Sequence, residues 1–232
     1  VVVAGLHSHL PVIVAALAAR APSARVAYVM TDGGALPLAL SDVVAGLTQR
    51  NLLVGTVTAG HAFGGDIEAL NVPSALALAR HVLGSDVIVV AMGPGVAGTN
   101  STLGFSGLEV APALDAVDWL GGRAIVSLRC SEADGRERHR GISHHSRTVL
   151  DAVRSSVDVV VPPGISPAND RHRWHEVDPG DVEALVAQFD LKVRSMGRGI
   201  QDDPIFFAAA AAAGTFAAGL INDDANATSS ES

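Results

Sequence analysis

Short, unbroken apolar runs alternate with helix-like segments along the chain, and this alternation restricts the fold more than any other feature. The runs lie at 1–5, 25–30, 52–58, 86–92, 123–128 and 157–161. Such Val, Ile and Leu runs are typical of parallel strands that are buried on both faces. Helices are predicted between them, over 10–21, 36–50, 73–83, 108–120 and 144–155. The pattern predicts one α/β domain in three α/β/α layers, with a mostly parallel, Rossmann-like sheet.

The C-terminal part of the chain is less regular. It predicts a polar loop over 164–176, a helix starting at Asp178-Pro179, a short strand over 189–195 and an Ala-rich helix over 204–221. That last helix is shorter than the ~20 strongly apolar residues of a membrane span, so no membrane insertion is expected. We expect it to pack against the domain or to form a homo-oligomer interface. Residues 1–222 are predicted to be the single domain and 223–232 a disordered tail.

Charge and cysteine content exclude some classes of function. The net charge of −8 argues against nucleic-acid binding, which needs a basic face. The single Cys130 excludes an intrachain disulfide and fits a reducing cytoplasm. No positively charged segment precedes an apolar one, so no signal peptide is expected. The chain starts inside an apolar run without Met, which indicates a processed or fragmentary N-terminus.

The stretch 129–147, RCSEADGRERHRGISHHSR, is the richest in chemical groups. It contains Arg136, Arg138, Arg140, Arg147, His139, His144 and His145. Guanidinium groups suit phosphate or carboxylate, and Ser143 is a candidate N-cap for a helix that starts with the two histidines. The alternative is a solvated loop whose arginines pair internally with its acidic residues. The density of cationic groups favours a site for an anionic ligand.

The segment 93–107, GPGVAGTNSTLGFSG, contains five glycines and follows a predicted strand. It matches neither nucleotide-binding glycine fingerprint. Glycines still let backbone N–H groups approach an anion in front of a helix. Gly93, Gly95, Gly98 and Thr99 are therefore candidate ligand-binding residues, alongside Arg136, Arg138 and Arg140. The alternative is a tight turn that only needs glycine dihedral angles.

Polar side chains follow the predicted strand ends, and these ends share one edge of a parallel sheet. The candidate catalytic residues are His61, His144, His145, Asp32 and Asp66. His7 and His9 with Asp32, His61, Asp66 and His144 could instead hold a metal. No H-E-x-x-H motif or Cys cluster supports that set, so no metal ligand is assigned and the cofactor stays open. Ser106 lacks the spacing of a nucleophile elbow, and Cys130 is expected to be structural.

Five motifs carry a resemblance to a known family. They are TDGGALPLALS, TAGHAFGGDIEALN, MGPGVAGTNSTLGFSG, LRCSEADGRERHRGISHHS and SMGRGIQDDPIFFAAAAAAG. Together, and in this order, they resemble the bacterial family catalogued as domain of unknown function 3866. The likeness extends to about Ala218. The resemblance implies a longer protein with an additional N-terminal segment, and it implies no catalytic roles, because the family has no established activity.

Three functions remain open at this point. The first is an enzyme acting on a small anionic metabolite, in which Arg136, Arg138 and Arg140 orient the anion and the Gly93–Gly98 backbone donates hydrogen bonds. His61, His144 or His145 would transfer protons, oriented by Asp32 or Asp66. The second is a ligand-sensing module without catalysis. The third is a structural protein that assembles through the helix at 204–221.

Overall fold

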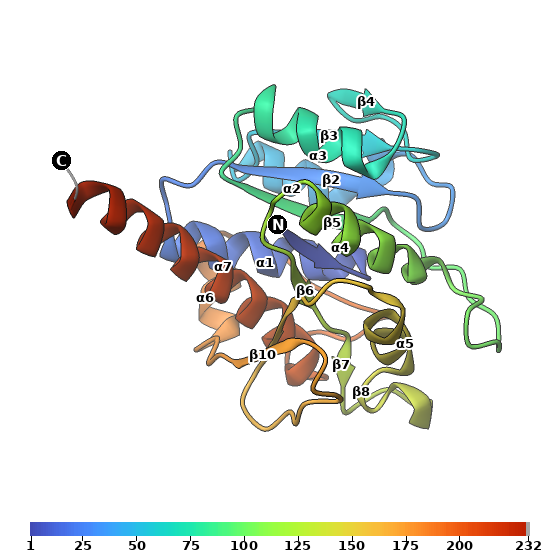
Figure 1. The fold of residues 1–232 in the computed structure, drawn as a ribbon. Helices are drawn as coiled ribbons and strands as arrows, with labels where there is room; N and C mark the ends of the chain where they lie inside the picture. Colours follow the sequence, from blue (N-terminus) through green and yellow to red (C-terminus); the bar gives the residue numbers. More distant parts are fainter. Residues whose placement is uncertain (231–232) are drawn as a thin grey trace.

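A computed structural model describes the backbone of residues 1–230 and the side chains of residues 1–223. Eight parallel strands form one sheet in the order β10-β9-β6-β1-β5-β2-β3-β4 (Figure 1). Their bounds are β1 Val2–Ala4, β2 Val26–Thr31, β3 Gly55–Ala59, β4 Ile67–Ala69, β5 Val87–Met92, β6 Ile125–Ser127, β9 Asp158–Val161 and β10 Arg173–Glu176. Two further strands, β7 Cys130–Ser131 and β8 Gly141–Ile142, form a small antiparallel pair. The predicted parallel α/β fold is confirmed.

Helices cover both faces of the sheet. One face carries α1 Leu10–Arg20, α2 Asp42–Gln49, α6 Val182–Gln188 and α7 Pro204–Ser230. The other carries α3 Val72–His81, α4 Val110–Trp119 and α5 His144–Ala152. Side chains of each strand alternate between the two cores, so Tyr28 packs on the first face and Val29 on the second. Both faces are apolar for this reason, and the central strands read as unbroken apolar runs.

The Ala-rich helix α7 packs mainly on α1 within its own domain. Its small side chains allow a close approach, and a Cβ atom at Gly214 would lie 2.5 Å from the backbone oxygen of Ile13. The segment Pro204–Asp223 is long and apolar enough to cross a membrane, but more than half of its most apolar part is buried in the fold. It is a core helix of the α/β domain. The helix continues to Ser230, beyond its predicted end near 221.

Several predicted elements differ from the structure. The strand predicted at 189–195 is wrong, because only Ser195 pairs, in an isolated bridge to Arg198. Leu191 and Val193 are apolar because they pack against the first core as loop residues. The helix predicted at 36–50 begins only at Asp42, where the Ser41 hydroxyl accepts the Val44 N–H. The loop predicted at 164–176 contains the edge strand β10.

Two other boundaries are set by local hydrogen bonds. The helix expected at Asp178-Pro179 starts at Val182, because Asp181 provides the N-cap and accepts the Ala184 N–H. Asp178 instead accepts the Gly180 N–H in the preceding turn. Ser143 does cap α5 by accepting the His145 N–H, as predicted.

The topology places a crevice at the carboxyl edge of the central strands. β1 leads into α1 on one face, whereas its neighbours β5 and β6 lead into α4 and α5 on the other face. Connections that leave in opposite directions open a gap between the strand ends, where ligands bind in open α/β sheets. The loops after β1, β5 and β6 all meet at this gap.

A buried carboxylate ties the far edge of the sheet together. Asp158, at the start of β9, is fully buried and accepts hydrogen bonds from Arg123 at 2.8 Å, Arg173 at 2.9 Å and His175 at 2.7 Å. Burial alone would raise the pKa of Asp158, but the hydrogen bonds from Arg173, Arg123 and His175 outweigh it and hold the pKa well below its usual range. The charged form is therefore the stable one in the folded protein.

This carboxylate makes the stability depend on pH. The pKa of Asp158 is lower in the folded protein than in the unfolded chain. Its contribution to the free energy of unfolding is therefore present above pH ~4, the ordinary carboxyl pKa, and is lost as the pH falls below that value. Asp158→Asn should destabilise the protein by about 3 kcal/mol at pH 7. The difference in the free energy of unfolding between the variant and the natural protein should decrease by about 1 kcal/mol when the pH falls from 6 to 3. Urea unfolding at both pH values measures this difference. A difference that grows on acidification contradicts the prediction.

Candidate functional site

A cavity of about 760 Å³ lies at the crevice and joins four segments of the chain. They are the turn after β1, the glycine-rich loop after β5, the Arg/His stretch after β6, and residues 194–196 ahead of α7. The polar residues that line it are His7, Ser8, Thr99, Asn100, Arg129, Arg136, Arg138, His139, His145, Arg194 and Ser195. Segments far apart in the chain thus meet at one edge of the sheet, as the strand pattern predicted.

Some predicted binding residues line this cavity and others do not. Gly95, Gly98, Thr99, Arg136 and Arg138 do, and so does the predicted catalytic residue His145. Arg140 lies outside the lining and donates from Nε to the Asp134 carbonyl oxygen at 3.1 Å. Gly93 lies against the Met30 side chain, where a Cβ atom would be 3.0 Å from the sulfur. These two residues support the loops rather than the cavity wall.

Four predicted catalytic residues, Asp32, His61, Asp66 and His144, are not among the residues that line the cavity. Asp66 accepts the N–H and hydroxyl of Thr56, both at 2.8 Å, near the amino end of β3. The chain turns back after β3 to form β4, so the expected position of Asp66 at the carboxyl edge is wrong. Asp32 caps a turn by accepting the Ala35 N–H at 2.8 Å. Asp32 and His61 are close to Glu109, whose pKa is raised by burial and by the Asp32 charge and lowered by His61.

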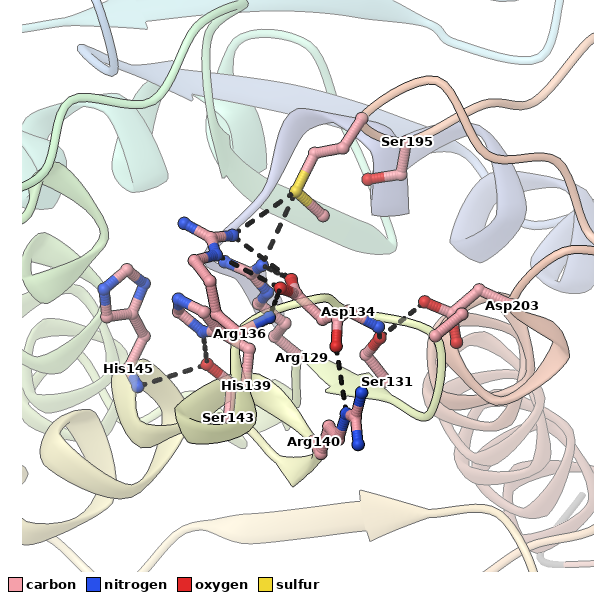
Figure 2. A network of polar contacts seen from close by, with 12 residues as sticks. Arg129, Ser131, Asp134, Arg136, His139, Arg140, Ser143, His145, Ser195 and Asp203 are labelled. Carbon is pink, nitrogen blue, oxygen red and sulfur yellow. Dashed lines mark hydrogen bonds and ion pairs between the residues drawn. The ribbon is translucent and has the colours of Figure 1, made fainter.

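A buried ion-pair group holds two of the cavity arginines. Arg129 is only 6% exposed and donates to Asp134 Oδ2 at 2.8 Å, while Arg136 Nε donates to Asp134 Oδ1 at 3.1 Å. Figure 2 shows the Asp134 carboxylate between the two guanidinium groups. Burial opposes the charge on Asp134, but the hydrogen bonds and charge of Arg136, with the charge of Arg129, hold its pKa well below the usual range. Both arginines are thereby held in the lining of the cavity.

The same group is tied to the start of α7. The Asp134 N–H donates to Ser131 Oγ at 3.0 Å, and the Ser131 hydroxyl donates to Asp203 Oδ2 at 2.6 Å (Figure 2). Arg198 forms ion pairs with Asp203 at 3.4 Å and with Asp134 at 3.8 Å. The Arg/His stretch is therefore an ordered part of the fold, and internal pairing accounts for some of its charge.

The remaining cavity arginines are less engaged. Arg138 donates to the Asn100 side-chain oxygen at 3.3 Å. Within residues 1–223, no hydrogen bond or ion pair holds the Arg194 guanidinium. Four arginines and three histidines line the cavity, and no Asp or Glu lies among the described lining residues. In a chain of net charge −8, this is a local reversal of sign that suits an anion.

Three histidines gather beside the cavity. The ring centroids lie 4.7 Å apart for His139 and His144, 4.9 Å for His139 and His145, and 4.3 Å for His144 and His145. Phe105 stacks on His145 at 3.9 Å. Burial and nearby arginine charge lower the pKa of His139 to about 3 and also lower the pKa of His144. Burial and the charge of His144 lower the pKa of His145 to about 4.

The metal-binding alternative that included His7 and His9 is not assembled. The His7 ring contacts the Met92 carbonyl oxygen at 3.1 Å and the Ser41 hydroxyl at 2.7 Å. The His9 ring contacts the Ser127 hydroxyl at 3.0 Å and packs edge-on against Phe206. The two rings thus serve different neighbours. Their nitrogens do not converge with Asp32, His61, Asp66 or His144.

Two residues with nucleophilic side chains are structural. Cys130 is fully buried, and burial raises the pKa of its thiol to about 12. Ser106 bonds to both the N–H and the carbonyl oxygen of Ala97, each at 3.2 Å, and so closes the glycine-rich loop. Neither residue is among those that line the cavity.

Sequence reasoning missed the contribution of residues 194–196. The predicted strand over 189–195 included its first two residues, whereas the structure places 194–196 in the cavity lining. Arg194 is the only charge in it, so its local pattern carries no signal of a site. Asn100 was not among the predicted site residues, and its side-chain oxygen accepts a hydrogen bond from Arg138.

Comparisons with known proteins give one result. A family model described as "Protein of unknown function (DUF3866)" matches residues 1–214. No curated protein and no solved structure matches the chain. The matched range contains every residue that lines the cavity.

Proposed function

We propose that this protein, which belongs to the DUF3866 family of proteins of unknown function, is an enzyme acting on a small metabolite that carries a phosphate or carboxylate group. The observation that carries the proposal is the cavity at the carboxyl edge of β1, β5 and β6, lined by arginines and histidines without a described acidic residue. Its volume of about 760 Å³ is in the range of small-molecule sites. An anion is the ligand that this lining would hold.

The arginines have two different roles in this proposal. Arg129 and Arg136 are held by Asp134, so they provide a fixed positive part of the cavity lining. Arg138 donates only to Asn100, and Arg194 has no partner among the described residues, so these two guanidinium groups can turn toward the ligand. Charge-assisted hydrogen bonds from guanidinium to phosphate or carboxylate are among the strongest in proteins.

The glycine-rich loop adds neutral donors. The Thr99 hydroxyl donates to the Gly104 carbonyl oxygen at 3.1 Å. This hydrogen bond shapes the loop, but the O–H group of Thr99 is then not available to a ligand. Among the described residues, the N–H groups of Gly95 and Gly98 donate to no other group. Both glycines line the cavity, so their N–H groups can bind anionic oxygens without competing side chains.

Imidazoles supply the reactive groups. His139 and His145 both line the cavity and lie close to Arg136 and Arg138 in the same segment. A histidine next to an anion site can transfer a proton to or from the bound molecule. The buried Cys130 supports a reducing compartment, and we place the activity in the cytoplasm.

Anion binding tests the proposal. Inorganic phosphate and malonate are titrated into the protein by calorimetry, in a buffer that contains a chelator. Arg138→Ala and Arg194→Ala should each weaken binding by roughly 10-fold or more, because each removes one charge-assisted hydrogen bond. Arg154→Ala, at an exposed position away from the cavity, should leave binding unchanged.

Two outcomes decide between the alternatives. If neither anion binds, or if Arg154→Ala weakens binding as much as Arg138→Ala, the anion site is wrong. If phosphorylated or carboxylated metabolites bind but mass spectrometry finds no product, the protein is a ligand-sensing module. A homo-oligomer through α7 is a separate possibility, tested by the mass of the protein in solution.

A further inference from the structure

We propose that His139, His144 and His145 form a binding site for a divalent transition-metal ion of the zinc class. One nitrogen from each of the three rings lies within 4.8 Å of the other two. The rings come from the short turn before β8 and from the first turn of α5, so the spacing along the chain is only H-x-x-x-x-H-H. This site is measured by metal binding alone, and the proton transfer proposed above for His139 and His145 applies to the metal-free protein.

Unpartnered nitrogen atoms provide the second observation. His139 is fully buried, and its Nε2 atom has no hydrogen-bond partner in the described part of the chain. The Nε2 atom of His144 is also buried without a partner there. Buried polar atoms are nearly always satisfied, since leaving one unpaired costs free energy. A metal ion bound by these nitrogens would satisfy both atoms at once.

The surroundings hold the rings in place for such a role. His139 Nδ1 lies 2.7 Å from the Ser143 hydroxyl (Figure 2). A proton on Nδ1 directed at Ser143 leaves the lone pair on Nε2, as in metal sites where the second ring nitrogen binds an outer partner. Phe105 stacks on His145 with an interplanar angle of 4° and fixes that ring.

The geometry needs a small adjustment. Ligand nitrogens about 2.0–2.1 Å from tetrahedral zinc lie roughly 3.3 Å from one another, closer than the 4.8 Å limit found here. His144 is only partly buried, so its side chain has room to rotate toward His139 and His145. Three imidazoles with one further position is the ligand count of a catalytic zinc site.

Charge determines what occupies the remaining position. Three neutral imidazoles leave the full metal charge in place, and Arg129, Arg136 and Arg138 lie nearby. An anion bound to the metal would offset this repulsion. His139 and His145 both line the cavity, so hydroxide or the anionic group of a ligand can reach the metal from that side. The metal site therefore opens toward the arginines rather than into the core.

Metal titration of the chelator-treated protein tests the site. Zn²⁺ binding is followed by calorimetry and Co²⁺ binding by visible absorption, and one ion of each should bind per chain, with the intense bands of tetrahedral cobalt. His139→Gln and His144→Gln should each weaken binding at least about 100-fold, since changes to outer-sphere partners already cost 10–100-fold. His81→Gln, at an exposed position on α3, should bind like the natural protein.

The proposal is overturned if the natural protein binds no stoichiometric Zn²⁺ and gives no cobalt bands. It is also overturned if both glutamine variants keep the natural affinity, because the three rings would then be a packed aromatic group only. Circular dichroism checks that each variant folds. If His139→Gln does not fold, the test is decided by His144→Gln, because His144 is only partly buried. Anion binding in the presence of chelator is unaffected by either result, so the two proposals fail separately.

Discussion

Asp134→Ala is expected to lower the free energy of unfolding by about 3–5 kcal/mol at pH 7. The substitution removes the acceptor from Arg129, whose side chain is only 7% exposed, and from Arg136. A buried guanidinium without its counter-charge is costly, because it can neither reach water nor lose its proton. Urea unfolding followed by circular dichroism measures the change.

The control for Asp134 is a surface ion pair of similar length. Asp190 lies 2.6 Å from Arg50, but its side chain is 87% exposed. Asp190→Ala should cost at most about 1 kcal/mol, as exposed pairs usually do. Equal losses for the two variants would mean that the buried position of Asp134 has no energetic importance. Asp134→Asn keeps an acceptor oxygen and should fall between the two.

Phe206→Ala should also lower the free energy of unfolding by about 3–5 kcal/mol. Phe206 is fully buried at the start of α7, where its ring packs against Phe207 at 5.1 Å and against His9 at 4.6 Å. Removing the ring leaves a void between α7 and the turn after β1, because the two backbones cannot collapse into it. Thermal and urea unfolding of the purified variant give the value.

A second phenylalanine separates loss of packing from loss of an aromatic ring as such. Phe63 is 50% exposed in the loop after β3, so Phe63→Ala should change the free energy of unfolding by less than about 1 kcal/mol. If Phe206→Ala is no more damaging than Phe63→Ala, the contact between α7 and the β1 turn does not support the fold in the way described.

The sequence predicted the centre of the sheet well and its edges poorly, for a physical reason. β1, β2 and β5 are buried on both faces and so read as continuous apolar runs. β10 has the sequence RWHE and β4 has IEA, because an edge strand meets water and needs no apolar run. Leu191 and Val193 gave a false strand, since a loop packed on a core has the same composition as a short strand.

The candidate site was predicted where local composition carries the signal. Arg136, Arg138 and His145 could be identified because charge is dense in one short segment. The capture of Arg140 by the Asp134 carbonyl oxygen depends on the fold of that segment and has no signature in composition. The position of Asp66 was predicted wrongly because β4 pairs parallel to β3, so the chain returns to the amino end of β3 before β4 begins. The sequence does not show this pairing.

The central position of β1 has a consequence for how the molecule is made. Val2 pairs with Val89 on one side and with Ile125 on the other, so β1 has no sheet partner until these later strands have been synthesised. Such distant pairing slows folding and leaves an apolar strand exposed on the nascent chain. During synthesis, β1 therefore stays an unpaired apolar segment that a chaperone could cover, and pulsed proteolysis of stalled chains would reveal when it becomes protected.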